Sequence, residues 1–164
     1  MDNNYLKYLL FYFILSVAGV RTQGQDVIKQ VSCFDATLKA QADSIKLSLI
    51  KKGFIVVKEA TMAMESEYEM PVIVPLAEGT WYQFVFIGDR TSKLYELRMY
   101  DFEERQVVYQ KQYGEGMESN IISYAYIPKS SEYHMIKSVQ VNKKKKKDIC
   151  EYLIIFKKVR RRSN

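Results

Sequence analysis

The spacing of apolar residues changes at Gly53, and this change constrains the fold more than any other feature of the sequence. Before Gly53 the apolar residues recur every three or four positions, whereas after it they recur every second position within short segments. The first spacing places side chains on one face of a helix, and the second places them on one face of a strand. The sequence therefore predicts one N-terminal helix followed by a chain built mainly of strands.

The predicted helix covers residues 26–52, and Gly53 ends it because glycine adopts the left-handed conformation that terminates helices. Ser32 and Asp35 both favour helix N-caps, so a break in this region is an alternative. We expect the apolar stripe of the helix to cover the open face or end of a sheet, rather than to bind a partner or a membrane. The stripe consists of Val27, Val31, Phe34, Leu38, Ala42, Ile45 and Leu49.

Eight segments after Gly53 are rich in Val, Ile, Tyr and Phe, and turn-forming residues separate them. This composition and spacing are typical of short antiparallel strands in a sandwich. A parallel sheet would need helices between its strands, and the sequence shows no second helical stripe. One segment, Trp81–Ile87, is apolar on both faces, which predicts a central strand covered on both sides. The predicted strands are Phe54–Met64, Val72–Leu76, Trp81–Ile87, Leu94–Phe102, Gln106–Gln110, Ile121–Ile127, Tyr133–Val141 and Cys150–Val159.

The first 24 residues are typical of a secretory signal peptide. Their apolar run, Tyr8–Val20, has 13 residues and is shorter than the ~20 helical residues that span a bilayer core. Thr22 and Gly24 suit a cleavage site, so we expect cleavage before Gln25. Cleavage after Gly19 and an uncleaved membrane anchor are the alternatives. The protein is thus expected to be secreted or periplasmic, and not transmembrane after cleavage.

The chain contains two cysteines, Cys33 and Cys150, and an oxidising compartment would allow a disulfide between them. The bridge would close a loop of more than a hundred residues. In the chain-entropy model, such a loop closure contributes about 4–5 kcal/mol to stability. The alternative is two buried free thiols that act as small apolar side chains, and only geometry decides between these states.

Composition and motifs argue against most enzyme classes. One histidine and two cysteines are too few for a Cys/His zinc site, and the sequence has neither a Gly-rich phosphate loop nor a G-x-S-x-G motif. The histidine, His134, is expected on a strand surface without a catalytic role. Glu65, Glu67 and Glu69 alternate, so they could share one face and bind Ca²⁺ or serve a glycosidase, but a solvated edge or loop is favoured. We expect no catalytic residues, no metal and no cofactor.

Aromatic residues are the candidate ligand-binding residues. The sequence contains 13 tyrosines and one tryptophan, and aromatic rings can form platforms for sugars. We single out Trp81, Tyr82 and Tyr100 for this role. The alternative is that most of the tyrosines are core residues with solvated hydroxyl groups.

Positive charge is concentrated near the C-terminus. Residues 137–164 carry a net charge of +9, whereas residues 25–136 carry −4. One basic cluster falls between the last two predicted strands and the other ends the chain, so a strand roughly 30 Å long would separate them. Such clusters could attract polyanions such as anionic lipid or acidic glycan, although runs of like charge are usually solvated. The candidate polyanion-binding residues are Lys143, Lys144, Lys145, Lys146, Lys147, Arg160, Arg161 and Arg162.

Four segments occur in an order that resembles the bacterial pre-peptidase C-terminal-like β-sandwich modules. They are Glu78–Phe86, Lys93–Asp101, Ile122–Pro128 and Glu132–Met135. In that family a "G-x-x-Y-x-F" strand precedes an "L-x-L-x-L-Y-D" strand, an aromatic strand ending in Pro, and a strand led by Tyr. The resemblance covers about residues 75–158. It implies a jelly-roll-like sandwich that accompanies secreted proteins and has no catalytic activity of its own.

Taken together, the sequence predicts a mainly β protein, an antiparallel, jelly-roll-like β-sandwich with one N-terminal α-helix packed on it. Its predicted parts are a signal peptide (1–24), the helix (25–53), the sandwich (54–159) and a basic tail (160–164). The predicted function is that of an exported, non-catalytic binding module that recognises a surface or partner through its loops and its basic end. The alternative is a carbohydrate-binding or carbohydrate-active domain that uses the aromatic and Glu residues. The expected partners are an anionic envelope surface, a glycan or a protein, without specific nucleic-acid binding.

Overall fold

The computed structural model describes residues 30–114 and 120–159. The predicted signal peptide with its cleavage site, Val27 and the cluster Arg160–Arg162 lie outside the described residues. Within the described ranges, eight strands occur where the spacing of apolar residues predicts them. The strands are β1 (Phe54–Met64), β2 (Met70–Leu76), β3 (Tyr82–Gly88), β4 (Ser92–Tyr100), β5 (Gln106–Tyr113), β6 (Ile121–Tyr126), β7 (Glu132–Asn142) and β8 (Ile149–Lys158).

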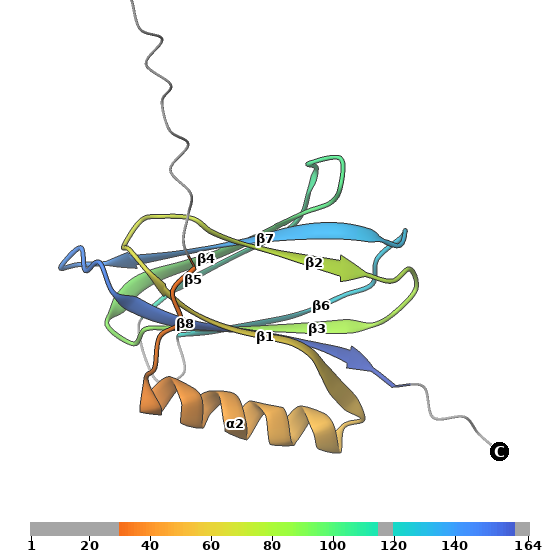
Figure 1. Cartoon of the computed structure of the whole chain (residues 1–164), viewed down its shortest axis with the longest axis horizontal. Helices are drawn as coiled ribbons and strands as arrows, with labels where there is room; N and C mark the ends of the chain where they lie inside the picture. Colours follow the sequence, from red (N-terminus) through yellow and green to blue (C-terminus); the bar gives the residue numbers. More distant parts are fainter. Residues whose placement is uncertain (1–29, 115–119, 160–164) are drawn as a thin grey trace, which may run out of the picture.

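The strands form two four-stranded antiparallel sheets that pack face to face (Figure 1). One sheet has the strand order β1-β8-β3-β6 and is termed the helix-covered sheet. The other has the order β2-β7-β4-β5 and is termed the open sheet. Strands far apart in the sequence are neighbours in both, since β1 pairs with β8 and β2 pairs with β7. This order is that of a jelly roll, so the predicted fold class is confirmed.

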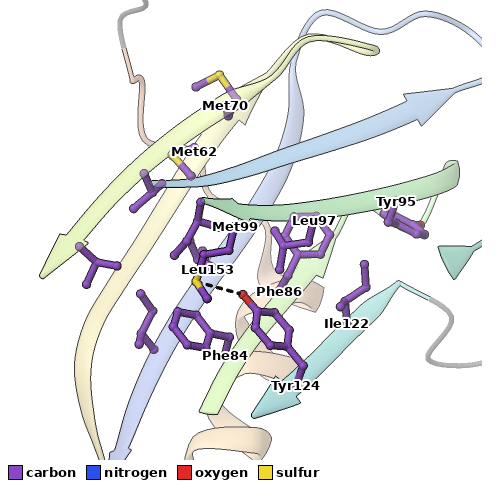
Figure 2. Close-up of a cluster of buried hydrophobic side chains, with 14 of the residues drawn as sticks. Met62, Met70, Phe84, Phe86, Tyr95, Leu97, Met99, Ile122, Tyr124 and Leu153 are labelled. Atoms are coloured by element: carbon purple, nitrogen blue, oxygen red, sulfur yellow. Dashed lines mark hydrogen bonds between the residues drawn. The ribbon is translucent and has the colours of Figure 1, made fainter. Parts of the chain in front are cut away.

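The main core lies between the two sheets and is built from inward-facing aromatic and aliphatic side chains (Figure 2). The rings of Phe84 and Tyr124, on neighbouring strands of the helix-covered sheet, stack with their centroids 5.0 Å apart. The Tyr124 hydroxyl donates to the sulfur of Met99 on the open sheet at 3.9 Å (Figure 2). The contact between Tyr124 and Met99 joins the two layers, and the burial of such large side chains is the main source of their stability.

The helix α2 (Ala36–Lys51) packs on the outer face of the helix-covered sheet (Figure 1). Asp35 caps it, because its carboxylate accepts hydrogen bonds from the backbone N–H groups of Thr37 and Leu38 at 2.8 and 2.9 Å. The predicted helix is therefore wrong for residues 30–35, which are not helical. The break near Asp35, left open by the sequence, is the alternative that the structure shows.

The apolar stripe of α2 is buried most deeply near its start. Leu38 and Ala42 are fully buried against the sheet, whereas Ile45 and Leu49 are half-buried beside them. The predicted contact between this stripe and the sheet is thus present, with its strongest part at Leu38. Two residues of the predicted stripe precede the helix and are exposed, namely Val31 and Phe34.

A disulfide joins Cys33, in the segment before α2, to Cys150 on β8. Their Cα atoms are 5.8 Å apart, and 117 positions separate them in the sequence. Of the two states that the sequence left open, the structure thus shows the bridge. Val31 also pairs with Ala63 of β1, so the segment before the helix is fixed to the sheet at two points. A disulfide of this kind is typical of exported proteins.

Two neighbouring strands of the helix-covered sheet, β3 and β8, are buried on both faces. On β3, Phe84 and Phe86 enter the core, while Val85 and Ile87 pack on the side of α2. The prediction of a central strand covered on both sides is confirmed for β3. Trp81, which the predicted strand included, lies just before β3 and is exposed.

Candidate functional site

The outer face of the open sheet is the candidate functional site. The helix contacts β1, β8 and β3 of the other sheet, so this face lies on the opposite side of the sandwich from α2 (Figure 1). Along β4, Leu97 and Met99 enter the core, whereas Arg98 and Tyr100 alternate with them and lie outside it. An antiparallel sheet with one solvated face can offer that face to a ligand, because the fold does not use it for burial.

The strand register brings outward side chains from three strands into rows across the open sheet. Arg98 on β4 lies opposite Tyr109 on β5 and, on its other side, opposite Lys137 on β7. In the neighbouring row, Glu96 lies opposite Lys111 of β5. Residues that face each other in this way are close enough to interact directly.

Five charged side chains form a continuous ion-pair network in these rows. Arg98 pairs with Glu69 at 2.7 Å and with Glu96 at 2.5 Å. Lys137 pairs with the other oxygen of Glu69 at 2.9 Å, and Lys111 pairs with Glu96 at 3.2 Å. Burial alone would raise the pKa of Glu96, but hydrogen bonds from Arg98 and Lys111 outweigh it and lower that pKa below its ordinary value. The network therefore holds ionised groups in fixed positions on the sheet.

Tyrosine rings flank this network. Tyr109 and Tyr113 project from β5 with 47% and 64% of their surface exposed. The Lys111 Nζ atom lies 5.7 Å from the ring centroid of Tyr113, and the Lys137 Nζ atom lies 5.5 Å from that of Tyr100. These cation–π contacts keep the rings next to the charged groups.

The face therefore combines flat apolar rings with oriented hydrogen-bond donors and acceptors. Three cationic and two anionic side chains leave the network nearly neutral. Such a surface suits a polar, weakly charged ligand that has an apolar side of its own. Among the described residues, no group of three or more His, Cys, Asp and Glu side chains is placed to hold a metal ion.

The three aromatic residues singled out from the sequence lie in three different environments. Tyr100 lies on the outer face of the open sheet, next to the network. Tyr82 is buried, and its hydroxyl accepts a hydrogen bond from the backbone N–H of Ala77 at 3.0 Å. Trp81 is partly exposed at one end of the sandwich, edge-on to Phe54. The structure thus does not bring these three rings together.

Most of the residues that make up this face were not predicted from the sequence. The outward positions of Gln106–Tyr113 include Tyr109, Lys111 and Tyr113, and their alternation was the available signal. That alternation shows which residues share a face of their own strand. It does not show that Arg98 and Lys137 lie in the same row, because the register between two strands depends on how the strands pair and not on the sequence of either strand alone.

The three alternating glutamates lie in and next to the turn between β1 and β2, rather than on one strand. Glu67 has a left-handed backbone with φ of 74°, which breaks the period of two. Glu65 and Glu67 are exposed, whereas Glu69 belongs to the ion-pair network. The solvated-loop interpretation therefore describes the first two, and the third has a place in the candidate site.

His134 is buried inside the sandwich, so its expected place on a strand surface is wrong. Its Nε2 atom lies 3.2 Å from the hydroxyl of Tyr126, and the two rings meet edge to face at 5.4 Å. The inward position follows from the register of β7, in which His134 shares the inner face with Ile136 and lies opposite Val74. This histidine packs in the interior next to a tyrosine.

The basic run of the β7–β8 turn lies at the start of β8, and Lys157 and Lys158 lie at its other end (Figure 1). Lys143, Lys144, Lys145 and Lys147 are exposed, and Lys146 is half-buried. The backbone carbonyl of Lys146 accepts a hydrogen bond from Ser66, which ties this turn to the β1–β2 turn. Polyanion binding by this run stays a prediction.

One carboxyl group is buried in the core between the sheets. Glu151 of β8 is fully buried, and one of its oxygens accepts a hydrogen bond from the Ser138 hydroxyl at 2.8 Å. The other oxygen has no hydrogen-bond partner among the described residues. Burial raises the pKa of Glu151 to about 7, so this group is half-protonated near neutral pH.

In the part of the chain that the structure describes, no helix is long and apolar enough to span a bilayer.

Comparison with known proteins adds a likeness of shape. The sequence matches no protein-family model and no curated protein. The structure is similar to part of a family GH115 4-O-methyl-α-glucuronidase, with a TM-score of 0.42 and 5% identity over 62% of this chain and 14% of that one. It is also similar to a family 61 carbohydrate-binding module in complex with β-1,4-galactotriose, with a TM-score of 0.37 and 14% identity over 66% of this chain and 84% of that one.

A third similar structure is that of tomato aspermy virus, with a TM-score of 0.34 and 8% identity over 97% of this chain and 98% of that one. Sandwich domains of unrelated function share this architecture, so these likenesses assign no activity to the chain.

Proposed function

We propose that this protein is an exported, non-catalytic β-sandwich module that binds a glycan on the outer face of the open sheet. The observation that carries this proposal is the tyrosine-flanked ion-pair network on a face opposite the helix. The other outer face contributes to the stability of the fold through its contact with α2. The open face is therefore the broad surface that the fold leaves for recognition.

The chemistry of the face matches that of a sugar. A pyranose ring has an apolar C–H side and a rim of hydroxyl groups. Tyr109 and Tyr113 offer exposed ring faces for the apolar side, and tyrosine does so at low conformational cost. Arg98 and Glu69 offer fixed donors and acceptors for the hydroxyl groups, since their partners already orient them.

The charge of the face narrows the class of glycan. The network holds two carboxylates and three cations, so their charges nearly cancel. A neutral or weakly acidic glycan would bind such a surface with little net charge attraction, so there is little attraction for salt to screen. Binding should therefore change little between low and physiological ionic strength.

A binding screen with matched variants tests this proposal. The parent protein would be run in native affinity gels against a panel of soluble neutral and acidic polysaccharides, and hits would be measured by calorimetry. Tyr109→Ala and Tyr113→Ala should each weaken binding at least about fivefold, the effect of truncating a central contact residue. Tyr68→Ala is the matched control, because Tyr68 is as exposed as Tyr113 and lies in the β1–β2 turn.

The remaining outcomes of the screen separate the alternatives. If both tyrosine variants still bind the polysaccharide and Trp81→Ala does not, the ligand site lies at the end of the sandwich where Trp81 lies. Binding that disappears at physiological salt would favour recognition of a polyanion. No retention of the parent by any polysaccharide in the panel would overturn the proposal.

A further inference from the structure

One end of the sandwich carries exposed apolar side chains from three separate segments. At this end α2 finishes, β1 and β3 begin and β8 finishes (Figure 1). Four apolar side chains here are between 44% and 52% exposed. We term them the apolar end patch, and they are Ile50, Ile55, Trp81 and Val159.

Lys158 holds the parts of this end together. Its Nζ atom lies 4.8 Å from the ring centroid of Phe54 and 5.9 Å from that of Trp81, and it donates to the backbone carbonyl of Lys52. Its backbone N–H donates to the Trp81 carbonyl at 2.8 Å, while that of Val159 donates to the Gly53 carbonyl at 3.0 Å. These bonds fix the Trp81 segment and the end of β8 beside the α2–β1 turn.

Two hollows adjoin Lys158. One, of about 770 Å³, includes Ile50, Ile55 and Val159 in its lining, and the other, of about 540 Å³, includes Trp81. Lys158 lines both of them. The apolar end patch is thus a continuous surface around one lysine.

The charge around the apolar end patch is mainly positive. Lys51 and Lys52 are exposed beside Ile50, and Lys157 and Lys158 are half-exposed at the end of β8. One acidic residue, Glu78, lines the hollow that includes Trp81, and none lines the hollow that includes Ile50.

The opposite end of the sandwich differs in its charge balance. A hollow there also combines a lysine with apolar side chains, since Lys147 lines it with Val31 and Tyr68. Glu65 and Glu69 line the same hollow, so two carboxylates offset the single lysine. The exposed lysines of the β7–β8 turn also lie at that end, but the hollow lined by exposed apolar side chains has an excess of positive charge only at the end of Trp81.

We propose that the apolar end patch docks on an anionic lipid bilayer. Trp81, Ile50 and Ile55 would enter the interface between headgroups and acyl chains, where tryptophan is one of the two enriched aromatic residues. The lysines around them would contact the anionic headgroups, each adding about 1 kcal/mol or fivefold in affinity. The strength of such interfacial binding depends on the buried apolar area and on electrostatic attraction to anionic lipid, and this end supplies both.

A soluble polyanion fits this surface less well than a bilayer does. Highly charged chains are bound by exposed cations and gain nothing from half-exposed isoleucines beside them. Ile50 and Ile55 leave apolar surface in water that a bilayer would bury at a gain of about 25 cal/mol for each Å². This docking is independent of the proposed glycan site, which lies on the open sheet.

The only tryptophan of the chain reports directly on this contact. The full chain would be titrated with vesicles of phosphatidylcholine alone and of phosphatidylcholine with one-third phosphatidylglycerol. With the anionic vesicles, Trp81 emission should shift to shorter wavelength, and lipids brominated near the headgroup should quench it. Because the signal is local to Trp81, binding through another part of the chain does not produce it.

Matched variants separate the two contributions. Replacing both Lys51 and Lys52 by Gln should weaken the Trp81-reported affinity about 25-fold, at about fivefold for each lysine. The control, Lys143→Gln with Lys144→Gln, removes the same charge at the other end and should leave it nearly unchanged. Ile50→Ser should weaken binding at every salt concentration, whereas Ile73→Ser, an equally exposed change on the open sheet, should not.

Three results would overturn the proposal. One is the absence of any Trp81 shift or quenching with anionic vesicles at low salt. Another is an equal loss for the control lysine pair, which would indicate a diffuse charge effect. The third is a Trp81 response to heparin as large as that to vesicles, which would identify a soluble polyanion as the ligand.

Discussion

The outer faces of the helix-covered sheet and the open sheet are built from similar strands, but they have different roles. On the helix-covered sheet, the outward side chains of β8 include Cys150, Tyr152 and Ile154, and they pack under α2. On the open sheet, the outward side chains of β4 include Glu96 and Arg98, which pair with charged neighbours. The first face is used for stability, so its changes should cost folding energy. The second is free of that constraint and can carry a binding site.

This difference predicts a gradient of mutational effects. Changes that detach α2 from its sheet should destabilise the protein most, because they expose a second apolar core to water. Replacement of the carboxyl group buried between the two sheets should alter the pH dependence of the stability. Changes on the open face should leave folding almost unaltered and show instead in binding.

The largest effect is expected from the disulfide that anchors the segment before α2. Replacing both Cys33 and Cys150 by Ser should lower the free energy of unfolding by about 4–5 kcal/mol, since the bridge closes a long loop in the unfolded chain. Urea unfolding of parent and variant measures this difference. Reductant should destabilise the parent by a similar amount and leave the variant unchanged. A decrease in the free energy of unfolding below about 1 kcal/mol would mean that packing against the sheet is enough to hold α2 in place without the disulfide.

The next effect is expected under α2 itself. Leu38→Ala should lower the free energy of unfolding by about 2–5 kcal/mol, because its side chain is fully buried. Leu49→Ala should cost less, since Leu49 is only half-buried at the rim of the same contact. The exposed Leu47 provides a control on the same helix, and Leu47→Ala should stay within about 0.5 kcal/mol. Equal melting shifts for all three variants would show that α2 is not docked as described.

A pH-dependent effect is expected from the carboxyl group between the sheets. Burial raises the pKa of Glu151 to about 7 in the folded protein, against an ordinary value of 4.5 in the unfolded chain. Between these values the folded state retains a proton that the unfolded state has released, so stability falls as the pH rises. The total loss should be roughly 3 kcal/mol, complete just above the folded pKa.

Glu151→Gln should remove this fall, because the amide does not titrate. Urea unfolding of parent and variant from acidic to slightly alkaline pH would measure the difference. The exposed Glu65→Gln serves as the control and should keep the slope of the parent. Parallel pH profiles for the parent and Glu151→Gln would show that the core carboxyl does not control the stability.

The smallest effect on folding is expected on the open face. Glu69→Gln removes the carboxylate that pairs with both Arg98 and Lys137, yet the free energy of unfolding should change by at most about 1 kcal/mol. High salt should reduce even this difference, because the pairs are partly exposed. Thermal unfolding in low and high salt measures it. A loss as large as that of Leu38→Ala would mean that this face, too, is used for stability.

Much of the secondary structure was predictable from local spacing. The apolar repeat identified all eight strands, and the N-cap preference of Asp35 indicated the start of α2 only as an alternative to a helix from residue 26. The two-sided apolar pattern of Trp81–Ile87 identified a central strand. These features depend on the backbone period and on residues that are close in the sequence, so the sequence contains them directly.

The candidate site was predictable only in part. Tyr100 was chosen from the sequence and lies beside the network, but Tyr82 is buried and Trp81 lies at the end of the sandwich. An aromatic residue in a strand can face the core or the solvent, and period two alone does not say which. For this reason the rings of β5, Tyr109 and Tyr113, were missed.

By itself, the sequence determined the elements, their order and the two cysteines that could pair. Only the tertiary structure decided that β1 and β2 pair with β8 and β7, which outer face α2 covers, and that His134 points inward. Alternation fixes the parity of side chains within a strand, but the choice between its two faces depends on what packs against each. That choice is made by contacts between segments far apart in the chain, so it belongs to the folded protein as a whole.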